Sequence, residues 1–206
     1  MNCVVMKFGG ASVARVKNFL NICKIIIERK KKFEKLVVVV SAMGKTTDKL
    51  LKLAKSIVLD PSKREQDMLV SVGERISMSI LSMALQKYNV KSISFTGSQS
   101  GIITCCNHAN AKIIDVKPQR IIEAFKYNDV VIVAGFQGVS LTKEITTLGR
   151  GGSDTSAVAL AIALNSDYVE FYKDVEGMYN NDPKNNKDTI FYEKLSYQKA
   201  LKICEN

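Results

Sequence analysis

The stretch Leu36-Val37-Val38-Val39-Val40 decides the fold, and Ser41-Ala42-Met43-Gly44 follows it directly. Five consecutive apolar residues, four of them β-branched, are typical of a strand that other elements cover on both faces. Segments with helical spacing separate this run from similar short runs at residues 4–8, 92–96, 113–116, 130–134 and 168–172. Strands that alternate with helices predict an α/β fold with a mostly parallel central sheet, whose functional side chains lie at the carboxyl ends of the strands.

Helical spacing predicts the helices between and after these strands. We expect Ser12 to cap the first helix, which should end near Lys31. The other helices are expected at residues 47–59, 65–87, 118–125 and 152–164 and from about residue 196, with one hairpin arm at residues 142–147. The core-facing side of helix 65–87 is predicted from apolar residues near helical spacing: Met68, Val72, Ile76, Ile80 and Met83.

The 206 residues carry a formal net charge of +10, which would suit a nucleic-acid partner. The excess is local, because residues 1–64 hold 15 Lys and Arg against 4 Asp and Glu. Much of it surrounds the end of the first predicted helix, at Lys24, Arg29, Lys30, Lys31, Lys32 and Lys35. Phe33 is the lone aromatic residue there, and a nucleic-acid site would interleave several. We therefore expect a solvated helix end and no nucleic-acid partner.

The five cysteines are Cys3, Cys23, Cys105, Cys106 and Cys204. Their number is odd, no CxxC spacing occurs, and two vicinal cysteines beside the single His108 make a poor metal-ligand set. We expect reduced thiols, a cytoplasmic location and no resident metal site. No run of 18 apolar residues and no signal peptide can be read, so no membrane partner is expected.

The first strand ends in Lys7-Phe8-Gly9-Gly10-Ala11-Ser12. Paired glycines let a backbone approach a ligand closely, and the following helix offers free N–H groups to an anion. A purely structural glycine turn is the alternative. After the second strand, Gly44-Lys45-Thr46 is similar to the end of a P-loop, but Val39 stands where a P-loop needs its first glycine. We therefore interpret residues 41–47 as a polar loop that faces the same crevice.

The strongest single signal is Leu148-Gly149-Arg150-Gly151-Gly152-Ser153-Asp154-Thr155. Arg150 can make a bidentate contact with a carboxylate. Helix capping alone would account for Ser153 and Asp154 but not for Arg150. The last strand leads into residues 172–184, where acidic, aromatic and basic residues suit a nucleotide site, and a plain surface turn is the alternative.

Six segments together resemble the aspartate kinases, a branch of the amino acid kinase family. They are KFGGAS at 7–12, VVVVSAMGKTTD at 37–48, SVGER at 71–75, FTGSQSGIIT at 95–104, AGFQG at 134–138 and TTLGRGGSDTSA at 146–157. Glutamate, acetylglutamate and uridylate kinases share the lysine-glycine start but lack the SVGER and GRGGSDT strings. The resemblance implies a three-layer αβα sandwich of the carbamate kinase type, with residues 1–206 as a kinase catalytic domain.

The resemblance also implies a reaction, in which the γ-phosphoryl group of Mg-ATP passes to the β-carboxylate of L-aspartate. This reaction opens the route to lysine, threonine and methionine. The implied catalytic residues are Lys7 and Asp154. The implied aspartate pocket consists of Ser41, Thr47, Glu74, Phe136, Arg150 and Ser153, in which Arg150 clamps the α-carboxylate and Glu74 with Asp154 meets the α-ammonium group. The implied nucleotide contacts are Lys7, Gly9, Gly10, Ser12, Lys173, Asp174, Tyr179 and Lys184.

The sequence departs from the family pattern in two places. Lys173 stands where threonine is common, and Lys184 stands where arginine is common, so the bidentate fork is lost there. Family members also continue into a further nucleotide-binding segment and regulatory ACT domains, so we expect residues 1–206 to be the amino-terminal portion of such a protein. Family members commonly pair through this domain, so we expect a homodimer. The alternatives are a glutamate-specific kinase and a non-catalytic ligand-binding subunit.

Overall fold

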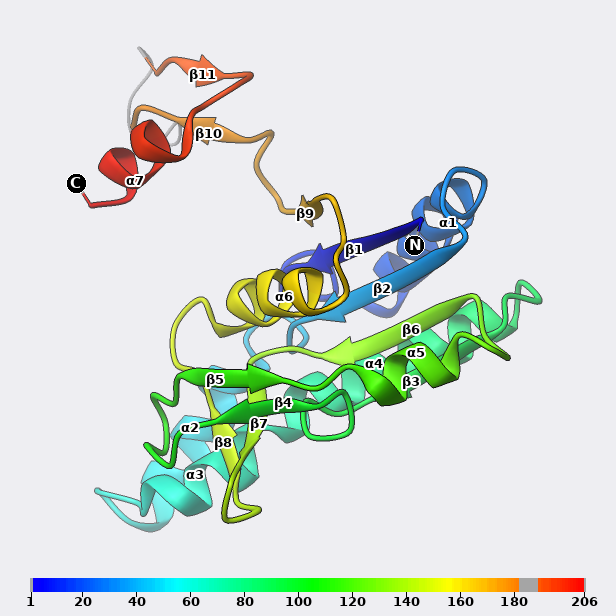
Figure 1. Ribbon diagram of the computed structural model, residues 1–206. Helices are drawn as coiled ribbons and strands as arrows, with labels where there is room; N and C mark the ends of the chain where they lie inside the picture. The colour runs from blue at the N-terminus through cyan, green and yellow to red at the C-terminus, as the bar shows by residue number, and fades with distance from the viewer. Residues whose placement is uncertain (1, 182–188, 206) are drawn as a thin grey trace. The chain divides into compact units, whose positions relative to one another are not determined.

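The computed structural model describes residues 2–181 and 189–205, and the chain divides into two units, residues 1–172 and 173–206. The first unit is built on a five-stranded sheet with the order β3-β6-β2-β1-β9, and each pairing in it is parallel. Its strands are β1 (Cys3–Phe8), β2 (Lys35–Val40), β3 (Ser92–Phe95), β6 (Val130–Ala134) and β9 (Val169–Tyr172). The predicted parallel sheet is confirmed, and the run at residues 36–40 forms its central strand (Figure 1).

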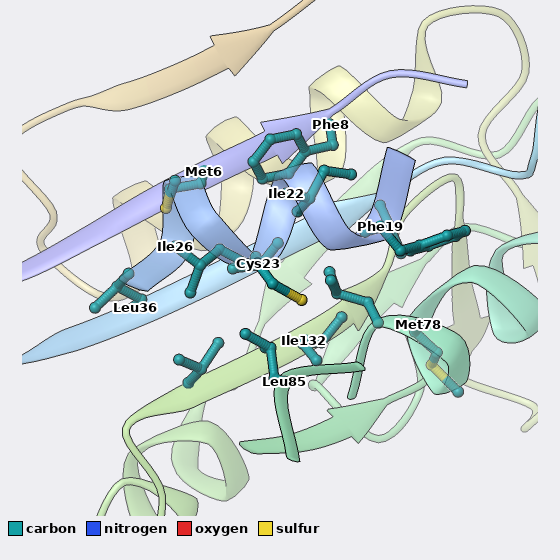
Figure 2. Close-up of a cluster of buried hydrophobic side chains, with 14 of the residues drawn as sticks. Met6, Phe8, Phe19, Ile22, Cys23, Ile26, Leu36, Met78, Leu85 and Ile132 are labelled. Carbon is teal, nitrogen blue, oxygen red and sulfur yellow. The ribbon is translucent and has the colours of Figure 1, made fainter. Parts of the chain in front are cut away.

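Two helical layers cover this sheet. Helices α1 (Val16–Lys30) and α4 (Val72–Gln86) cover one face, and α5 (Gln119–Ala124) and α6 (Gly152–Ala163) cover the other. The pleat sends alternate residues of β2 to opposite layers: Val38 packs with α1 and α4, whereas Val39 packs with α5 and α6. Figure 2 shows the first of these two cores, where side chains from α1, α4 and three strands gather. The three-layer αβα sandwich is confirmed.

A second, four-stranded sheet with the order β5-β4-β7-β8 lies in the same unit. Its strands are β4 (Ile102–Thr104), β5 (Ile113–Val116), β7 (Gln137–Ser140) and β8 (Ile145–Thr147). The predicted hairpin arm and the strand at 113–116 are confirmed, but this strand belongs to the second sheet rather than to the parallel one. Helices α2 (Thr46–Ile57) and α3 (Lys63–Val70) pack on each other, and α3 packs on β8.

Ser12 is not the N-cap of the first helix. Helix α1 begins at Val16, and its cap position is Arg15, which makes no side-chain cap hydrogen bond. The Ser12 hydroxyl instead donates to the backbone oxygen of Tyr172 at 3.2 Å. The serine therefore ties the glycine turn after β1 to the end of β9, and residues 9–15 form a turn before the helix starts.

The predicted core-facing side of helix 65–87 is wrong. The segment forms two abutting helices, α3 and α4, and Met68, Val72, Ile76 and Met83 are 39–60% exposed, while Ile80 is partly buried. The buried side of α4 carries Gly73, Glu74, Ser77, Met78, Leu81, Ser82 and Leu85. A Cβ on Gly73 would lie 2.7 Å from that of Ala42, so a glycine lets the helix approach the loop after β2. The buried face thus combines large apolar residues with small and polar ones, and it lies on a different side of the helix from most of the predicted residues.

The basic end of α1 is only partly solvated. Lys31 and Lys32 are exposed, as expected, but the Arg29 side chain donates to Glu170 at 2.9 Å and Lys30 lies 2.5 Å from Asp129. These pairs join the helix to the sheet region. Residues 63–86 are long and apolar enough to cross a membrane by length and composition alone. Half of the most apolar stretch within them is buried inside the protein, as in the core helix of a globular domain.

The second unit contains a short antiparallel pair, β10 (Met178–Tyr179) and β11 (Phe191–Tyr192), and the helix α7 (Tyr197–Glu205). The rings of Tyr179 and Phe191 lie 5.4 Å apart across this pair. The predicted last helix is confirmed, and the Lys199 N–H donates to the Ser196 hydroxyl at 3.3 Å, which is an N-cap contact.

The orientation of α4 predicts unequal costs for two truncations of similar size. Leu81 is fully buried against β2 and β6, so Leu81→Ala should lower the free energy of unfolding by about 2–5 kcal/mol. Ile76 is 43% exposed, so Ile76→Ala should cost less than about 1 kcal/mol. Urea denaturation followed by circular dichroism measures both. Equal losses would contradict the observed orientation of the helix.

Candidate functional site

Three strand ends and the starts of three helices, α2, α4 and α6, surround one cavity of about 290 Å³ in the first unit. Because β1, β2 and β6 are parallel, their carboxyl ends deliver Lys7, Ser41 and Phe136 to the same edge of the sheet. The first turn of α4 adds Glu74, and the turn before α6 adds Arg150. The full lining is Lys7, Gly10, Ser41, Ala42, Gly44, Thr47, Glu74, Phe136, Gly149, Arg150, Gly151, Gly152, Ser153 and Asp154. Every residue expected in an amino-acid pocket therefore lies around this cavity.

An ion pair joins β1 to α6 at the cavity. Lys7 Nζ lies 2.5 Å from Asp154 Oδ1, and Lys7 is only 6% exposed. A buried ammonium group needs a partner, because desolvation of an unpaired charge costs several kcal/mol. Asp154 stands in the first turn of α6, where the helix dipole also favours a negative charge. The pair holds the lysine ammonium group at the cavity wall, where it can meet a negatively charged ligand.

Glu74 presents a buried carboxyl oxygen to the same cavity. One oxygen, Oε1, accepts the Ala42 N–H at 3.1 Å. The other, Oε2, is buried and has no hydrogen-bond partner among the described residues. Burial raises the pKa of Glu74 from 4.5 to about 7, against the smaller opposing effect of its backbone hydrogen bonds. A buried acceptor without a partner is costly, and a cationic ligand would satisfy it.

The backbone at the end of β6 is shaped for close contact with α6. A Cβ on Gly135 would lie 2.8 Å from the Cβ and 3.0 Å from the Cα of Ser153, so only glycine fits there. The next residue, Phe136, has φ of 67°, a left-handed conformation that costs a bulky residue energy. Its N–H donates to the Ser156 hydroxyl at 3.1 Å, and its carbonyl accepts from Leu148. Our sequence reasoning did not assign Gly135 a role, although it lies in the quoted AGFQG segment.

Arg150 is exposed at this cavity, and no ion pair with it occurs among the described residues. Its guanidinium group is therefore available for an anionic ligand. A second cavity of about 440 Å³ adjoins the first and shares Thr47, Phe136, Gly149 and Arg150 with it. Asp67, Ala109 and Thr147 also line this second cavity.

Only some of the residues expected to contact the nucleotide line this cavity. Gly10 lines the cavity beside Lys7, whereas Gly9 and Ser12 both donate to the backbone oxygen of Tyr172, at 3.2 Å each. Lys173, Asp174 and Tyr179 belong to the second unit, where the Tyr179 hydroxyl donates to Glu176 at 3.4 Å. Lys184 lies outside the described residues. No group of three or more His, Cys, Asp or Glu side chains that could hold a metal occurs in the described part of the chain.

The raised pKa of Glu74 predicts a pH-dependent effect of Glu74→Gln on stability. Between pH 4.5 and 7 the folded protein keeps a proton on Glu74 that the unfolded chain releases. The folded state therefore binds more protons in this range, and its stability falls as the pH rises. The variant lacks this loss, so its stability relative to the unsubstituted protein should increase by about 3 kcal/mol from pH 4.5 to pH 8. Urea denaturation of both proteins across this range tests it, and parallel pH profiles would disprove it.

Curated aspartokinases are similar to this chain in sequence. The chain is 48% identical over 205 residues to the aspartokinase of Corynebacterium glutamicum, a match that covers 99% of this chain and 49% of that protein. The aspartokinase 2 of Bacillus subtilis is likewise 48% identical and covers 99% of this chain and 50% of its own length. The chain therefore spans about half the length of the curated relatives it matches.

Solved structures of aspartate kinases have a similar fold. The structure is similar to aspartate kinase from Synechocystis, with a TM-score of 0.84 and 41% identity over 98% of this chain and 33% of that one. It is also similar to E. coli aspartokinase III in complex with aspartate and ADP, with a TM-score of 0.80 and 25% identity over 90% of this chain and 52% of that one. The model of the amino acid kinase family matches residues 2–205. Because this family model matches nearly the whole chain and the structure is the expected three-layer sandwich, the chain belongs to the amino acid kinase family.

Proposed function

We propose that this chain is the catalytic part of an aspartate kinase, which transfers the γ-phosphoryl group of Mg-ATP to the β-carboxylate of L-aspartate. One observation carries the proposal. A single cavity presents a buried lysine ammonium group paired with Asp154, a buried Glu74 oxygen without a partner among the described residues, and the available guanidinium group of Arg150. The similarity to an aspartokinase that binds aspartate and ADP supports the same assignment.

An amino acid with an acidic side chain matches these groups one by one. The guanidinium group of Arg150 suits the α-carboxylate, because it can bind a carboxylate through two parallel hydrogen bonds. The α-ammonium group would satisfy Glu74 Oε2 and would favour the ionised form of that carboxyl. Ser41, Thr47, Phe136 and Ser153 line the remaining wall. The side-chain carboxylate is then left to face Lys7.

The transfer asks for positioning and charge neutralisation rather than covalent catalysis. A β-carboxylate oxygen attacks the γ-phosphorus while the bond to the bridging oxygen breaks, and ADP leaves with the bonding electrons. The acceptor is ionised at pH 7, so no general base is needed. Lys7 would neutralise charge on the transferring phosphoryl group, and Asp154 would orient Lys7 and meet the substrate ammonium.

The turn after β1 supplies the expected phosphate contacts. Gly10 beside Lys7 would lie at the phosphates, with Gly9 and Ser12 supporting that turn from the Tyr172 side. Lys173, Asp174, Tyr179 and Lys184 stay predicted contacts of the nucleotide. Mg²⁺ enters as part of the Mg-ATP substrate, since this ion keeps several waters and is commonly held through substrate phosphates.

The wider setting follows from the proposed reaction. We infer that its product, 4-phospho-L-aspartate, feeds the biosynthesis of lysine, threonine and methionine, and that the protein acts in the cytoplasm.

We also infer self-association through this domain as a dimer. Sedimentation of the full-length protein at several concentrations would reveal that dimer, and a single monomeric species at micromolar concentration would disprove it.

The substrate assignment predicts which acceptor the full-length protein prefers. With Mg-ATP, aspartate should give an acyl phosphate that hydroxylamine traps as a hydroxamate. Glutamate and N-acetylglutamate should give far less hydroxamate, and UMP should give little ADP release. A clear preference for any of these other acceptors would refute the proposal in favour of another amino acid kinase.

The role of Lys7 distinguishes a kinase from a binding module. Lys7→Met keeps the length of the side chain but removes the charge, so kcat should fall by about 10²–10³-fold, which corresponds to roughly 3–4 kcal/mol of transition-state stabilisation. Lys17→Met, the same change at an exposed position of α1, is the matched control and should leave kcat unaltered. Turnover that survives Lys7→Met would favour a non-catalytic role for the cavity.

The carboxylate clamp predicts a KM effect for Arg150→Lys. Lysine keeps the positive charge but loses the two-point fork. The KM for aspartate should therefore rise by about tenfold, with the KM for ATP unchanged. Steady-state kinetics with each substrate varied in turn measures both values, and a selective rise in the KM for ATP would assign Arg150 to the nucleotide instead.

A further inference from the structure

Asp67 is a fully buried carboxylate that lies outside the lining of the candidate active site. It belongs to α3, has no exposed surface, and lies on the wall of the second cavity beside the site. A carboxyl group in such a place needs hydrogen-bond partners, because an unsatisfied buried polar group is strongly destabilising. The function proposed above assigns it no part.

Three groups from two other segments contact its carboxyl oxygens. The Thr147 hydroxyl, at the end of β8, donates to Oδ1 at 2.5 Å. The Ala109 N–H, in the loop between β4 and β5, donates to both oxygens at 3.1 Å. His108 Nδ1 lies 2.7 Å from Oδ2, within hydrogen-bond distance. Asp67 therefore fastens α3, the 105–112 loop and β8 together at one point.

These partners flank the turn that carries Arg150. Thr147 precedes Arg150 by three residues, and its carbonyl accepts the Ala111 N–H at 2.8 Å. Gly149 has φ of 75°, and a Cβ there would lie 2.9 Å from Asn110 Oδ1, so the loop presses directly on the turn. The Leu148 N–H also donates to the Phe136 carbonyl at 2.9 Å, which ties the same turn to the second residue after β6.

The same carboxylate is also linked to the start of α4. Helix α3 runs through Ser71 into α4, which carries Glu74 in its first turn. The Ser71 carbonyl accepts from the Gln137 side chain at 2.8 Å, next to Phe136. Asp67 thus stands between the elements that present the expected partners of the acceptor's α-carboxylate and α-ammonium groups.

We propose that Asp67 is a positioning residue for acceptor recognition. Through Thr147 and the Ala109 amide it holds the turn at residues 147–150 in the conformation from which Arg150 grips the acceptor's α-carboxylate. The effect on acceptor affinity rests on the proposed function, whereas the ordering of the turn does not. Loss of the Asp67 contacts should loosen the turn and weaken acceptor binding without changing the affinity for the nucleotide.

Two adjacent threonines of β8 provide a matched test. Thr147 donates to Asp67, whereas Thr146 shares a buried hydrogen bond of 2.5 Å with Thr104 within the second sheet. Both side chains are at least 98% buried, so each change to valine removes one buried hydrogen bond at nearly constant volume. A purely structural role for Asp67 predicts similar behaviour of the two variants. A positioning role predicts a difference in acceptor affinity.

The experiment uses the full-length protein and steady-state kinetics with each substrate varied. Thr147→Val and Asp67→Asn should each raise the acceptor KM by about tenfold or more, with the KM for ATP within about twofold, because small displacements of a binding group weaken its contacts strongly. Thr146→Val should leave both values within about twofold, and Thr147→Ser, which keeps the hydroxyl, should restore the acceptor KM. Equal acceptor KM values for Thr147→Val and Thr146→Val would overturn the proposal.

A second readout does not depend on activity. Amide hydrogen exchange of the ligand-free protein should be at least about tenfold faster at Leu148 and Gly152 in Thr147→Val, and unchanged there in Thr146→Val. If the unsubstituted protein phosphorylates none of the acceptors, the proposed function fails, and the exchange rates alone decide the positioning role. Unchanged exchange in Thr147→Val would overturn that role whatever the activity.

Discussion

The parallel direction of the five strands in the main sheet is the constraint on which the rest of the molecule depends. Parallel neighbours cannot be joined by tight turns, so each crossover carries a helix that covers one face of the sheet. The same constraint brings the carboxyl ends of β1, β2 and β6 to one edge. Lys7, Ser41 and Phe136 meet there because of this topology, although up to about 130 residues separate them in the chain.

The charges at that edge are held at a cost to stability. Lys7 is buried but paired with Asp154, so its desolvation is largely offset. Glu74 keeps one buried oxygen without a partner among the described residues, and burial raises its pKa to about 7. Phe136 adds a left-handed backbone at the same place. Strain and unsatisfied polarity gathered at one cavity are typical of a site arranged for a ligand rather than for maximal stability.

Much of the framework could be predicted, because burial on both faces leaves continuous apolar runs such as residues 36–40 and 130–134. The second sheet could be predicted only in part, since β4 and β7 have three and four residues and carry no clear periodicity. The face of α4 was mispredicted because small and polar residues, Gly73, Glu74 and Ser77, are buried there while Ile76 and Met83 stay exposed. Hydrophobic periodicity identifies an apolar face, whereas the buried face of α4 carries Glu74 at the cavity as well as core residues such as Leu81.

The sequence by itself determined the parallel α/β class, the positions of the main strands, and the glycine-rich motifs that surround the cavity. Local pattern suffices there, because apolar runs and turn glycines act within a few residues. Only the tertiary structure decided that Lys7 pairs with Asp154, that Glu74 keeps an unpartnered oxygen, and that Asp67 joins three segments behind Arg150. Those features depend on burial and on contacts between residues 32 to 147 positions apart, which no local pattern encodes.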